Sequence, residues 1–312
     1  MQVFESINNL TKNNNTVLTL GTFDGIHPGH VKIIDKMVDR SKENGLRNIV
    51  IVFHPHPRSV LSTSNNVKLL TTPREKQVLL EKSGVEILLT INFTRKFASL
   101  SAEDFIYKYL IYGIGLSEIV IGHDHHFGKG RGGNVELLKK IGEKENFSII
   151  TVNAFYINDE VVSSTKIRNA ISKGDVQRAN SLLGRNYSFS GTIVGGDKRG
   201  RELGYPTANI KLSSQDKLLP AIGIYAVRVQ LKNENHIGLL SIGRRPTFYN
   251  AGELVSEVYI YNFNREIYGE ELEIELVERL RGEEKFNSAE ELINQMNKDK
   301  ENGLKIFNKL NN

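Results

Sequence analysis

Apolar residues in the first half of the chain follow two alternating patterns. Short apolar runs, which are typical of buried strands, occur at 16–20, 48–53, 86–91, 118–121 and 147–152. Segments of helical pattern occur at 29–42, 101–111 and 134–145. Residues 71–75, with a threonine cap, a proline near the first turn and a glutamate close behind, open another helix. Strands that alternate with helices predict a parallel sheet covered by helices on both faces, the α/β class of fold.

The pattern changes near residue 186. Residues 164–183 keep helical spacing, and Gly184 is placed to end that helix. The runs beyond it are β-type and separated by turns, at 187–194, 222–231, 236–242, 254–263 and 271–277. They predict a small all-β barrel, followed by an amphipathic helix over 288–310. We therefore expect two domains, 1–185 and 186–312.

Composition narrows the classes of protein that remain. The 312 residues include no cysteine, which excludes disulfides, thiolate metal sites and a cysteine nucleophile. No apolar run approaches the roughly 20 residues that a membrane helix needs. Residues 1–10 lack the charged start and apolar core of a signal peptide. We expect a cytoplasmic protein with no membrane partner.

Charge is unevenly distributed along the chain. Residues 1–186 contain 24 Lys and Arg against 18 Asp and Glu, a net charge of +6, and residues 187–312 contain 17 against 18, a net charge of −1. The positive charge of residues 1–186 favours anionic substrates such as nucleotides. On charge alone, a surface that only keeps the protein soluble explains the excess equally well. No stretch interleaves dense Lys and Arg with aromatic residues, so we expect no nucleic-acid partner.

A glycine-rich turn follows the first expected strand and leads into a helix. It reads Gly-Thr-Phe-Asp-Gly-Ile-His-Pro-Gly-His over 21–30. Glycines let a backbone approach phosphate closely, and a helix N-terminus offers free N–H groups. His27 and His30 fall on one side of the first turn, where they can donate to phosphate oxygens as charge builds in a transition state. The other nucleotide-binding candidates here are Gly21, Phe23, Asp24, Gly25 and Gly29.

Two histidine-containing loops follow other strands of the expected sheet, and parallel strands end at a shared edge. Residues 53–58 read Phe-His-Pro-His-Pro-Arg, and residues 122–131 read Gly-His-Asp-His-His-Phe-Gly-Lys-Gly-Arg. A metal site is one interpretation of each loop. The first loop has no supporting carboxylate or cysteine, and the glycines and basic residues of the second suit a nucleotide better.

A Val-Ser-Ser-Thr-Lys-Ile-Arg segment at 162–168 opens the helix that precedes the second domain. Hydroxyls and N–H groups at a helix start, with basic side chains, form a cradle for a triphosphate. An ordinary serine N-cap is the alternative. The candidate ATP-binding residues here are Ser163, Ser164, Thr165 and Arg168.

A second glycine-rich segment begins the all-β part. Residues 200–209 read Gly-Arg-Glu-Leu-Gly-Tyr-Pro-Thr-Ala-Asn, which lacks the Gly-Lys-Ser/Thr ending of a Walker A loop. The hydroxyl of Thr207 and the amide oxygen of Asn209 are suitable ligands for a hard cation. A β-turn is the alternative. The candidate ATP-binding residues here are Gly200, Arg201, Gly204 and Pro206.

These motifs resemble two enzyme families joined in one chain. The segment from His27 to His30 matches the HxGH signature of the α/β nucleotidyltransferases, and the preceding Gly-Thr-Phe-Asp-Gly narrows the resemblance to the FAD synthetase branch. Residues 200–209 resemble the glycine loop and Pro-Thr-Ala-Asn motif of riboflavin kinases. The motif order resembles that of the bacterial bifunctional riboflavin kinase/FAD synthetases over nearly the whole chain. The resemblance implies a Rossmann-like sheet followed by a riboflavin-kinase barrel with a terminal helix.

The resemblance also implies residue roles. Thr207 and Asn209 would hold Mg²⁺, and Glu257, which matches the glutamate of a Thr-Val-Glu-Val-His-Leu-Leu-Asp-Phe strand, would take the proton from the riboflavin hydroxyl. The implied flavin contacts are His56, Pro57, Arg58, Asp124, Phe127, Arg245 and Tyr268. The chain departs from the family pattern at His125, Tyr259 and Asn262, so the roles of these residues and of His126 stay open.

The implied reactions are riboflavin plus ATP to FMN and ADP, then FMN plus ATP to FAD and pyrophosphate. ATP is the co-substrate, Mg²⁺ assists, and no prosthetic group is required. Expected partners are therefore riboflavin, FMN, FAD and ATP, with a weak homo-oligomer left open. Three alternatives remain: a single active site, a transferase for another phosphorylated alcohol, or a flavin-binding regulatory module.

Overall fold

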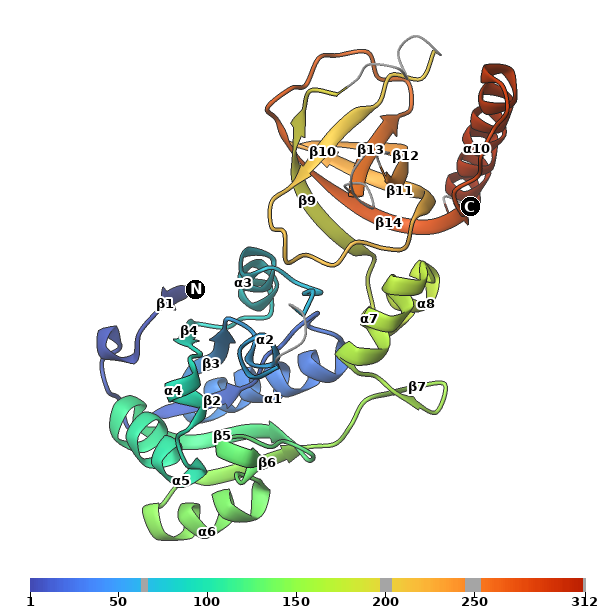
Figure 1. The fold of residues 1–312 in the computed structure, drawn as a ribbon. Helices are drawn as coiled ribbons and strands as arrows, with labels where there is room; N and C mark the ends of the chain where they lie inside the picture. Colours follow the sequence, from blue (N-terminus) through green and yellow to red (C-terminus); the bar gives the residue numbers. More distant parts are fainter. Residues whose placement is uncertain (63–66, 197–203, 245–253, 311–312) are drawn as a thin grey trace. The chain divides into compact units, whose positions relative to one another are not determined.

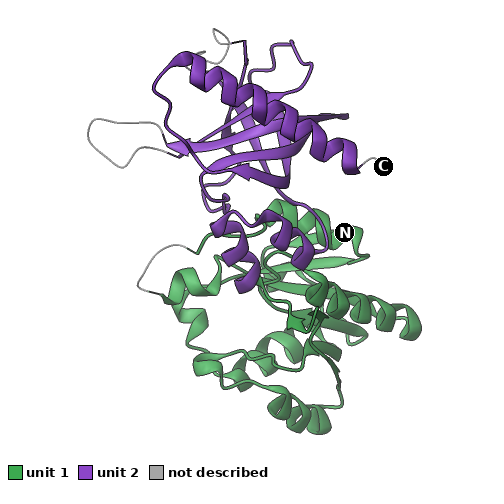
Figure 2. Cartoon of the chain, turned by 90° about the vertical axis from the view of Figure 1, so that its right-hand side faces the viewer, with its two compact units in different colours: residues 1–164 green, residues 165–312 purple. Residues whose placement is uncertain are grey.

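The computed structural model describes residues 1–62, 67–196, 204–244 and 254–310. The chain divides into two compact units, Met1–Ser164 and Thr165–Asn312 (Figure 2). The expected domain boundary between residues 185 and 186 stays a prediction. Among the described residues, no helix is both long and apolar enough to cross a membrane.

The first unit is built on a six-stranded sheet in the order β1-β4-β3-β2-β5-β6, in which every described pair of neighbours is parallel (Figure 1). This confirms the predicted α/β sheet. All five expected strands are present in this sheet, whose edge strand β1 was not predicted. The strands are β1 (Gln2–Phe4), β2 (Thr16–Leu20), β3 (Arg47–His54), β4 (Ile87–Asn92), β5 (Leu116–Gly122) and β6 (Ser148–Val152).

Alternating side chains of the strands enter two separate cores, one on each face of the sheet. Leu18 and Leu20 of β2 join the core of one face, and Val17 joins the other. The first core is completed by α5 (Ala102–Phe105), the π-helix η2 (Ile106–Ile114) and α6 (Val135–Glu145). The second core is completed by α1 (Pro28–Asn44) and α3 (Pro73–Lys82).

Helix boundaries in this unit follow local signals. Thr72 and Glu75 form the reciprocal capping box that starts α3, with Pro73 in the first turn. Helix α1 ends at Gly45, whose φ of 62° is left-handed. The short elements between the main ones are η1 (Ile7–Asn9), α2 (Pro57–Leu61), α4 (Arg95–Ala98), η3 (Lys129–Arg131), β7 (Tyr156–Ile157) and β8 (Glu160–Val161).

The helix expected over 164–183 is two helices in the structure. It divides into α7 (Ser164–Lys173) and α8 (Val176–Leu183), because Gly174 has a left-handed φ of 78° and Asp175 caps a new helix. A side chain at Gly174 would also collide with Arg279, which donates to the carbonyls of Lys173 and Ile222. The prediction that Gly184 ends the helical region is confirmed, with φ at 69°.

The second unit contains a closed antiparallel barrel in the order β10-β13-β12-β11-β14-β9, as the sequence predicts. Strand β10 is the one that the hydrophobic pattern did not indicate. The long α10 (Ala289–Leu310) packs against the outside of the barrel (Figure 1). The strands are β9 (Tyr187–Val194), β10 (Ala208–Leu212), β11 (Gly223–Leu231), β12 (Glu234–Arg244), β13 (Leu254–Ile260) and β14 (Glu271–Arg281).

Candidate active sites

The topology of the sheet marks one point for ligand binding. After β2 the chain adds β3 and β4 on one side, and it later places β5 on the other side of β2. Ligands of open α/β sheets bind at such a switch point, beyond the carboxyl ends of the strands. The glycine-rich turn after β2 and the histidine-containing loop after β5 both begin there.

The turn after β2 has an unusual backbone. Phe23, Gly25 and Ile26 all have positive φ, at 44°, 90° and 39°. Such angles strain a phenylalanine or an isoleucine, and strain of this kind concentrates at functional sites. Phe23 and Ile26 are both buried in the core beneath α1, so packing holds the strained turn in place.

Asp24 fixes this turn to the start of α3. Its carboxylate is fully buried and accepts hydrogen bonds from the backbone N–H groups of Leu70 and Thr71, at 3.0 Å each. The Thr71 hydroxyl in turn accepts from the N–H of Gly25 at 3.0 Å. These bonds give Asp24 a holding role, and its predicted contact with ATP stays a prediction.

Lys76 is a half-buried lysine beside the same turn that the sequence motifs did not reveal. Its ammonium group donates to the carbonyl of Thr22 at 2.6 Å. Burial lowers the pKa of Lys76, and the nearby carboxylate of Asp24 opposes that shift. No motif contains this lysine, because its contact spans 54 residues of sequence.

The structure brings His27 and His30 together at the N-terminus of α1. Their rings stack with centroids 3.7 Å apart and an interplanar angle of 19°. Phe23 meets His30 edge-on at 5.2 Å. At Gly29, a Cβ atom would lie 3.2 Å from the His27 ring, so the glycine leaves room for the stack. Gly21 likewise accommodates Phe23, with a Cβ position 3.3 Å from that ring.

Helix α7 begins against the glycine-rich turn. The hydroxyl of Ser164 donates to the carbonyl of Asp24 at 2.8 Å, across 140 residues of sequence. Ser164 therefore lies beside the histidine turn, and the predicted phosphate cradle stays a prediction. Ser163 lies directly before the helix, and Thr165 and Arg168 continue it within the second unit.

The loop after β5 contains His125, which departs from the family pattern. Burial lowers the pKa of His125 to about 4, with Asp124 opposing the shift, so its imidazole is neutral near pH 7. Its ring stacks on Phe127 at 5.8 Å, and its buried Nε2 atom has no hydrogen-bond partner among the described residues. The role of His125 therefore stays open. His126 instead contacts the carbonyl of Asp124 through Nδ1 at 2.8 Å.

Phenylalanines connect this loop to the end of β3. Phe127 contacts Phe105 at 5.9 Å, and Phe105 contacts both Phe53 and Phe97. Phe53 ends the apolar run of β3, directly before the predicted flavin loop. These rings belong to the core on one face of the sheet, in which Phe105 and Phe127 are buried. The sequence did not single them out, because they are spread over four elements.

His56, Pro57 and Arg58 form the start of the short helix α2. The ring of His56 caps that helix by accepting from the Arg58 N–H at 3.1 Å, and Pro57 occupies the first turn. Arg58 is exposed. Within the described part of the chain no group of three or more His, Cys, Asp or Glu side chains is arranged to hold a metal ion. Flavin contacts from this segment stay a prediction.

The second site lies on the barrel, where three predicted residues meet. The hydroxyl of Thr207 donates to Oε2 of Glu257 at 3.0 Å. Asn209 on β10 is paired directly opposite Glu257 on β13. A Cβ atom at Gly196 would lie 2.0 Å from the amide nitrogen of Asn209, so only glycine leaves space for that side chain. Gly200, Arg201 and Arg245, which were also predicted here, lie outside the described residues.

Two other predicted residues frame the loop around this site. Gly204 has a left-handed φ of 81°, and Pro206 follows two residues later, directly before Thr207. Tyr268 has an exposed fraction of 51% and precedes Gly269, whose N–H donates to the carbonyl of Ile193 at 2.9 Å. The predicted contact of Tyr268 with the flavin stays a prediction.

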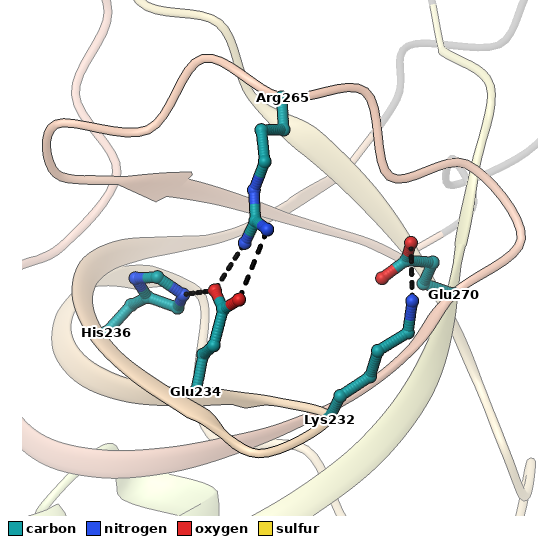
Figure 3. A network of polar contacts seen from close by, with 5 residues as sticks. All are labelled: Lys232, Glu234, His236, Arg265 and Glu270. Carbon is teal, nitrogen blue, oxygen red and sulfur yellow. Dashed lines mark hydrogen bonds and ion pairs between the residues drawn. The ribbon is translucent and has the colours of Figure 1, made fainter.

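A separate polar network lies at the turn between β11 and β12 (Figure 3). Arg265 forms two hydrogen bonds to Glu234, and His236 Nε2 lies 3.1 Å from the same carboxylate. Lys232 pairs with Glu270 at 3.0 Å. The hydrogen bond from Arg265 lowers the pKa of Glu234. The network joins the turn to the segment between β13 and β14, and none of the predicted site residues belongs to it.

Comparison with known proteins also divides the chain into two parts. Family models for FAD synthetase and riboflavin kinase match residues 9–166 and 183–307. Three relatives are described as bifunctional riboflavin kinase/FMN adenylyltransferase. The one from Listeria monocytogenes is 40% identical over 297 residues, 95% of this chain and 94% of the relative. That from Bacillus subtilis is 38% identical over 299 residues, 95% and 93%. That from Escherichia coli K12 is 33% identical over 310 residues, 98% of each.

A solved structure shares the whole architecture. A chain from Streptococcus pneumoniae, described as a macrolide-efflux protein, is 32% identical with a TM-score of 0.87, covering 96% of this chain and 97% of that one. A histidine turn on a doubly wound sheet and an oxygen-rich site on a barrel define an enzyme that transfers nucleotidyl and phosphoryl groups. This chain belongs to the bifunctional riboflavin kinase/FMN adenylyltransferase family. Its two reactions produce FMN and FAD, and both use ATP.

Proposed function

We propose that the two reactions occur at two separate sites, one in each unit. The turn with His27 and His30 catalyses adenylylation of FMN, and the site with Thr207, Asn209 and Glu257 catalyses phosphorylation of riboflavin. The observation that carries this division is the Thr207–Glu257 hydrogen bond, which assembles a polar site entirely within the barrel. The stacked histidines belong to the first unit.

Adenylylation needs no nucleophilic side chain. The phosphate oxygen of FMN attacks the α-phosphorus of ATP, a new P–O bond forms, and pyrophosphate leaves. The protein's contribution is positioning and charge stabilisation. His27 and His30 donate to phosphate oxygens as negative charge builds, and Gly21, Gly25 and Gly29 let the backbone approach. The N-terminus of α1 adds N–H donors beside them.

Phosphorylation of riboflavin needs a group that receives the proton of the 5′-hydroxyl. Glu257 fits this role, because it accepts a hydrogen bond from Thr207 at one oxygen and so retains a second oxygen for substrate. The 5′-oxygen then attacks the γ-phosphorus of ATP, and ADP leaves. The loop around Gly204 and Pro206 holds the nucleotide phosphates.

The barrel site fits a magnesium ion. The side chains assembled there offer a hydroxyl, an amide and a carboxylate, which are oxygen donors of the kind that Mg²⁺ prefers. Thr207 and Asn209 would hold the ion. When bound, it neutralises phosphate charge during transfer. The close fit of Asn209 over Gly196 keeps the amide in place for that purpose.

The remaining assignments extend this proposal. His56, Pro57, Arg58, Asp124 and Phe127 bind the flavin of the first reaction, supported by the row of phenylalanines beside Phe127. Tyr268 and Arg245 bind riboflavin in the second. We place the enzyme in the cytoplasm, where its co-substrate ATP is available. No prosthetic group is required, and weak self-association stays a prediction.

A time course of products tests the proposed pathway. Purified enzyme is incubated with riboflavin, ATP and Mg²⁺, and flavins are separated by chromatography. FMN appears first and FAD follows after a lag, since FMN is the substrate of the second step. FAD without any intermediate FMN would contradict free passage between two sites. Neither product, with FMN also left unconverted, would favour a flavin-binding regulatory role.

A further inference from the structure

Tyr205 connects the segment that precedes β10 to the terminal helix α10. It lies two residues before Thr207, and its hydroxyl donates to the side-chain oxygen of Asn297 on α10. The Tyr205 side chain is buried, and burial is the main cause that raises its pKa, so the hydroxyl keeps its proton and can donate. The two residues are 92 positions apart, so no local motif predicts this bond.

Helix α10 is itself held firmly to the barrel. Asp299 is buried and accepts three hydrogen bonds from Arg281 of β14, at 2.8 to 3.0 Å. Gln295 donates to the same carboxylate at 2.9 Å, and the hydroxyl of Tyr261 donates to the carbonyl of Lys300 at 2.8 Å. Asn297 lies between these anchors, so it presents its oxygen from a fixed position.

Tyr259 on β13, the strand that carries Glu257, packs against Tyr205. It lies two residues after Glu257, and alternate residues of a strand share a face. Its ring packs against Tyr205 with centroids 5.3 Å apart and against Tyr261 at 5.6 Å. Tyr259 and Tyr261 belong to the apolar cluster beneath α10. One face of β13 therefore carries both Glu257 and the packing that supports Tyr205.

We propose that Tyr205 and Asn297 are positioning residues for riboflavin phosphorylation, and that α10 is part of the kinase site. The bond fixes the start of the Tyr-Pro-Thr segment, which keeps the Thr207 hydroxyl in reach of Glu257. Neither residue touches the reacting atoms. This inference rests on the proposed assignment of Thr207 and Glu257 to the kinase reaction.

Four variants of the full chain test the connection. Tyr205→Phe removes the donor, Asn297→Leu removes the acceptor, and the double variant removes both. Asn297→Asp keeps an oxygen acceptor at the same position. Asn294→Leu is the matched control, because Asn294 is an exposed asparagine on the same helix. For each we measure kcat and KM for riboflavin, formation of FAD from supplied FMN, and the thermal unfolding midpoint.

Tyr205→Phe and Asn297→Leu should each lower kcat for riboflavin about tenfold, because one hydrogen bond contributes about that much to the barrier. KM for riboflavin should change less than about twofold. The double variant should be no slower than either single variant, because both remove the same bond. Asn297→Asp should recover most of kcat. Asn294→Leu should match the parent, and FAD formation should be unchanged throughout.

Three kinetic results would overturn the inference: kcat within about twofold of the parent in both single variants, losses that multiply in the double variant, or an equal loss in Asn294→Leu. A loss that only follows a lowered unfolding midpoint would also overturn it, since that indicates a purely structural bond. Glu257→Gln, measured alongside, separates the two claims. If it leaves FMN formation intact, the site assignment itself is wrong.

Discussion

The stacked imidazoles of His27 and His30, with centroids 3.7 Å apart, lie at the end of a turn that the carboxylate of Asp24 holds in place. Asp24, three residues before His27, bonds to the segment that starts α3, and Ser164 at the start of α7 bonds to its carbonyl. The histidine site is thus assembled from three helix starts around one strained turn.

Removing the Asp24 carboxylate should destabilise the first unit. Asp24→Ala leaves the N–H groups of Leu70 and Thr71 without their acceptor and Lys76 without its nearby carboxylate. We expect a loss of about 3 kcal/mol or more, as for a buried charge that loses its partner. Calorimetric unfolding should show a lowered transition, with FAD formation lost first on warming.

The matched control for that experiment is Asp39→Ala, an exposed aspartate on α1. It should leave both the unfolding profile and the two activities close to those of the parent. If Asp24→Ala unfolds at the parent's temperature, the hydrogen bonds to Leu70 and Thr71 do not hold the turn.

Gly196→Ala should impair riboflavin phosphorylation alone. The new Cβ atom would lie 2.0 Å from the Asn209 amide, so Asn209 must move from its place opposite Glu257. Displacement of a positioned group by about 1 Å lowers rates on the order of 10²-fold. The measurement is the initial rate of FMN formation at saturating ATP and Mg²⁺. FAD formation from FMN serves as the internal reference.

Gly195→Ala provides the control one residue away. A Cβ atom at Gly195 meets no atom within 4 Å, so this variant should phosphorylate riboflavin at the parent's rate. Equal rates in the two alanine variants would show that the position of Asn209 does not govern the reaction.

The neutral His125 should make the first unit sensitive to acid. Burial lowers the pKa of its imidazole from 6.5 to about 4, so between these values the unfolded chain binds a proton that the folded chain does not. Stability therefore decreases as pH falls from about 6.5 toward 4, and it is unaffected above that window. His125→Phe removes this group while keeping an aromatic ring beside Phe127.

The unfolding midpoints of the parent and His125→Phe, compared at pH 7.5 and pH 5, measure this effect. The parent should lose more stability on acidification than the variant. An equal loss in the two proteins would mean that His125 is not held neutral in the folded state.

The hydrophobic pattern predicted the main elements because long buried strands and amphipathic helices leave periodic signals. The edge strand β1 has three residues, too few for a period, and β10 was missed because it carries Asn209 and Lys211 among its apolar residues. The break between α7 and α8 was missed because a single glycine within a helical pattern does not reveal that its φ is left-handed.

Site residues that lie in sequence motifs could be predicted, and those that depend on long-range contacts could not. His27, His30, Thr207 and Glu257 lie in motifs whose residue types suit the chemistry, and the structure assembles them as two groups. Lys76 and the Tyr205–Asn297 bond depend on contacts across 54 and 92 residues. Such contacts arise from packing of the finished fold, and no spacing along the chain encodes them.

The most direct test of two independent sites is a crossed measurement on His30→Ala and Glu257→Ala. Each variant is given riboflavin or FMN, with ATP and Mg²⁺, and its products are separated by chromatography. His30→Ala should make FMN but no FAD, and Glu257→Ala should make FAD from supplied FMN but no FMN from riboflavin. Loss of both activities in either folded variant would contradict the separation of the two sites.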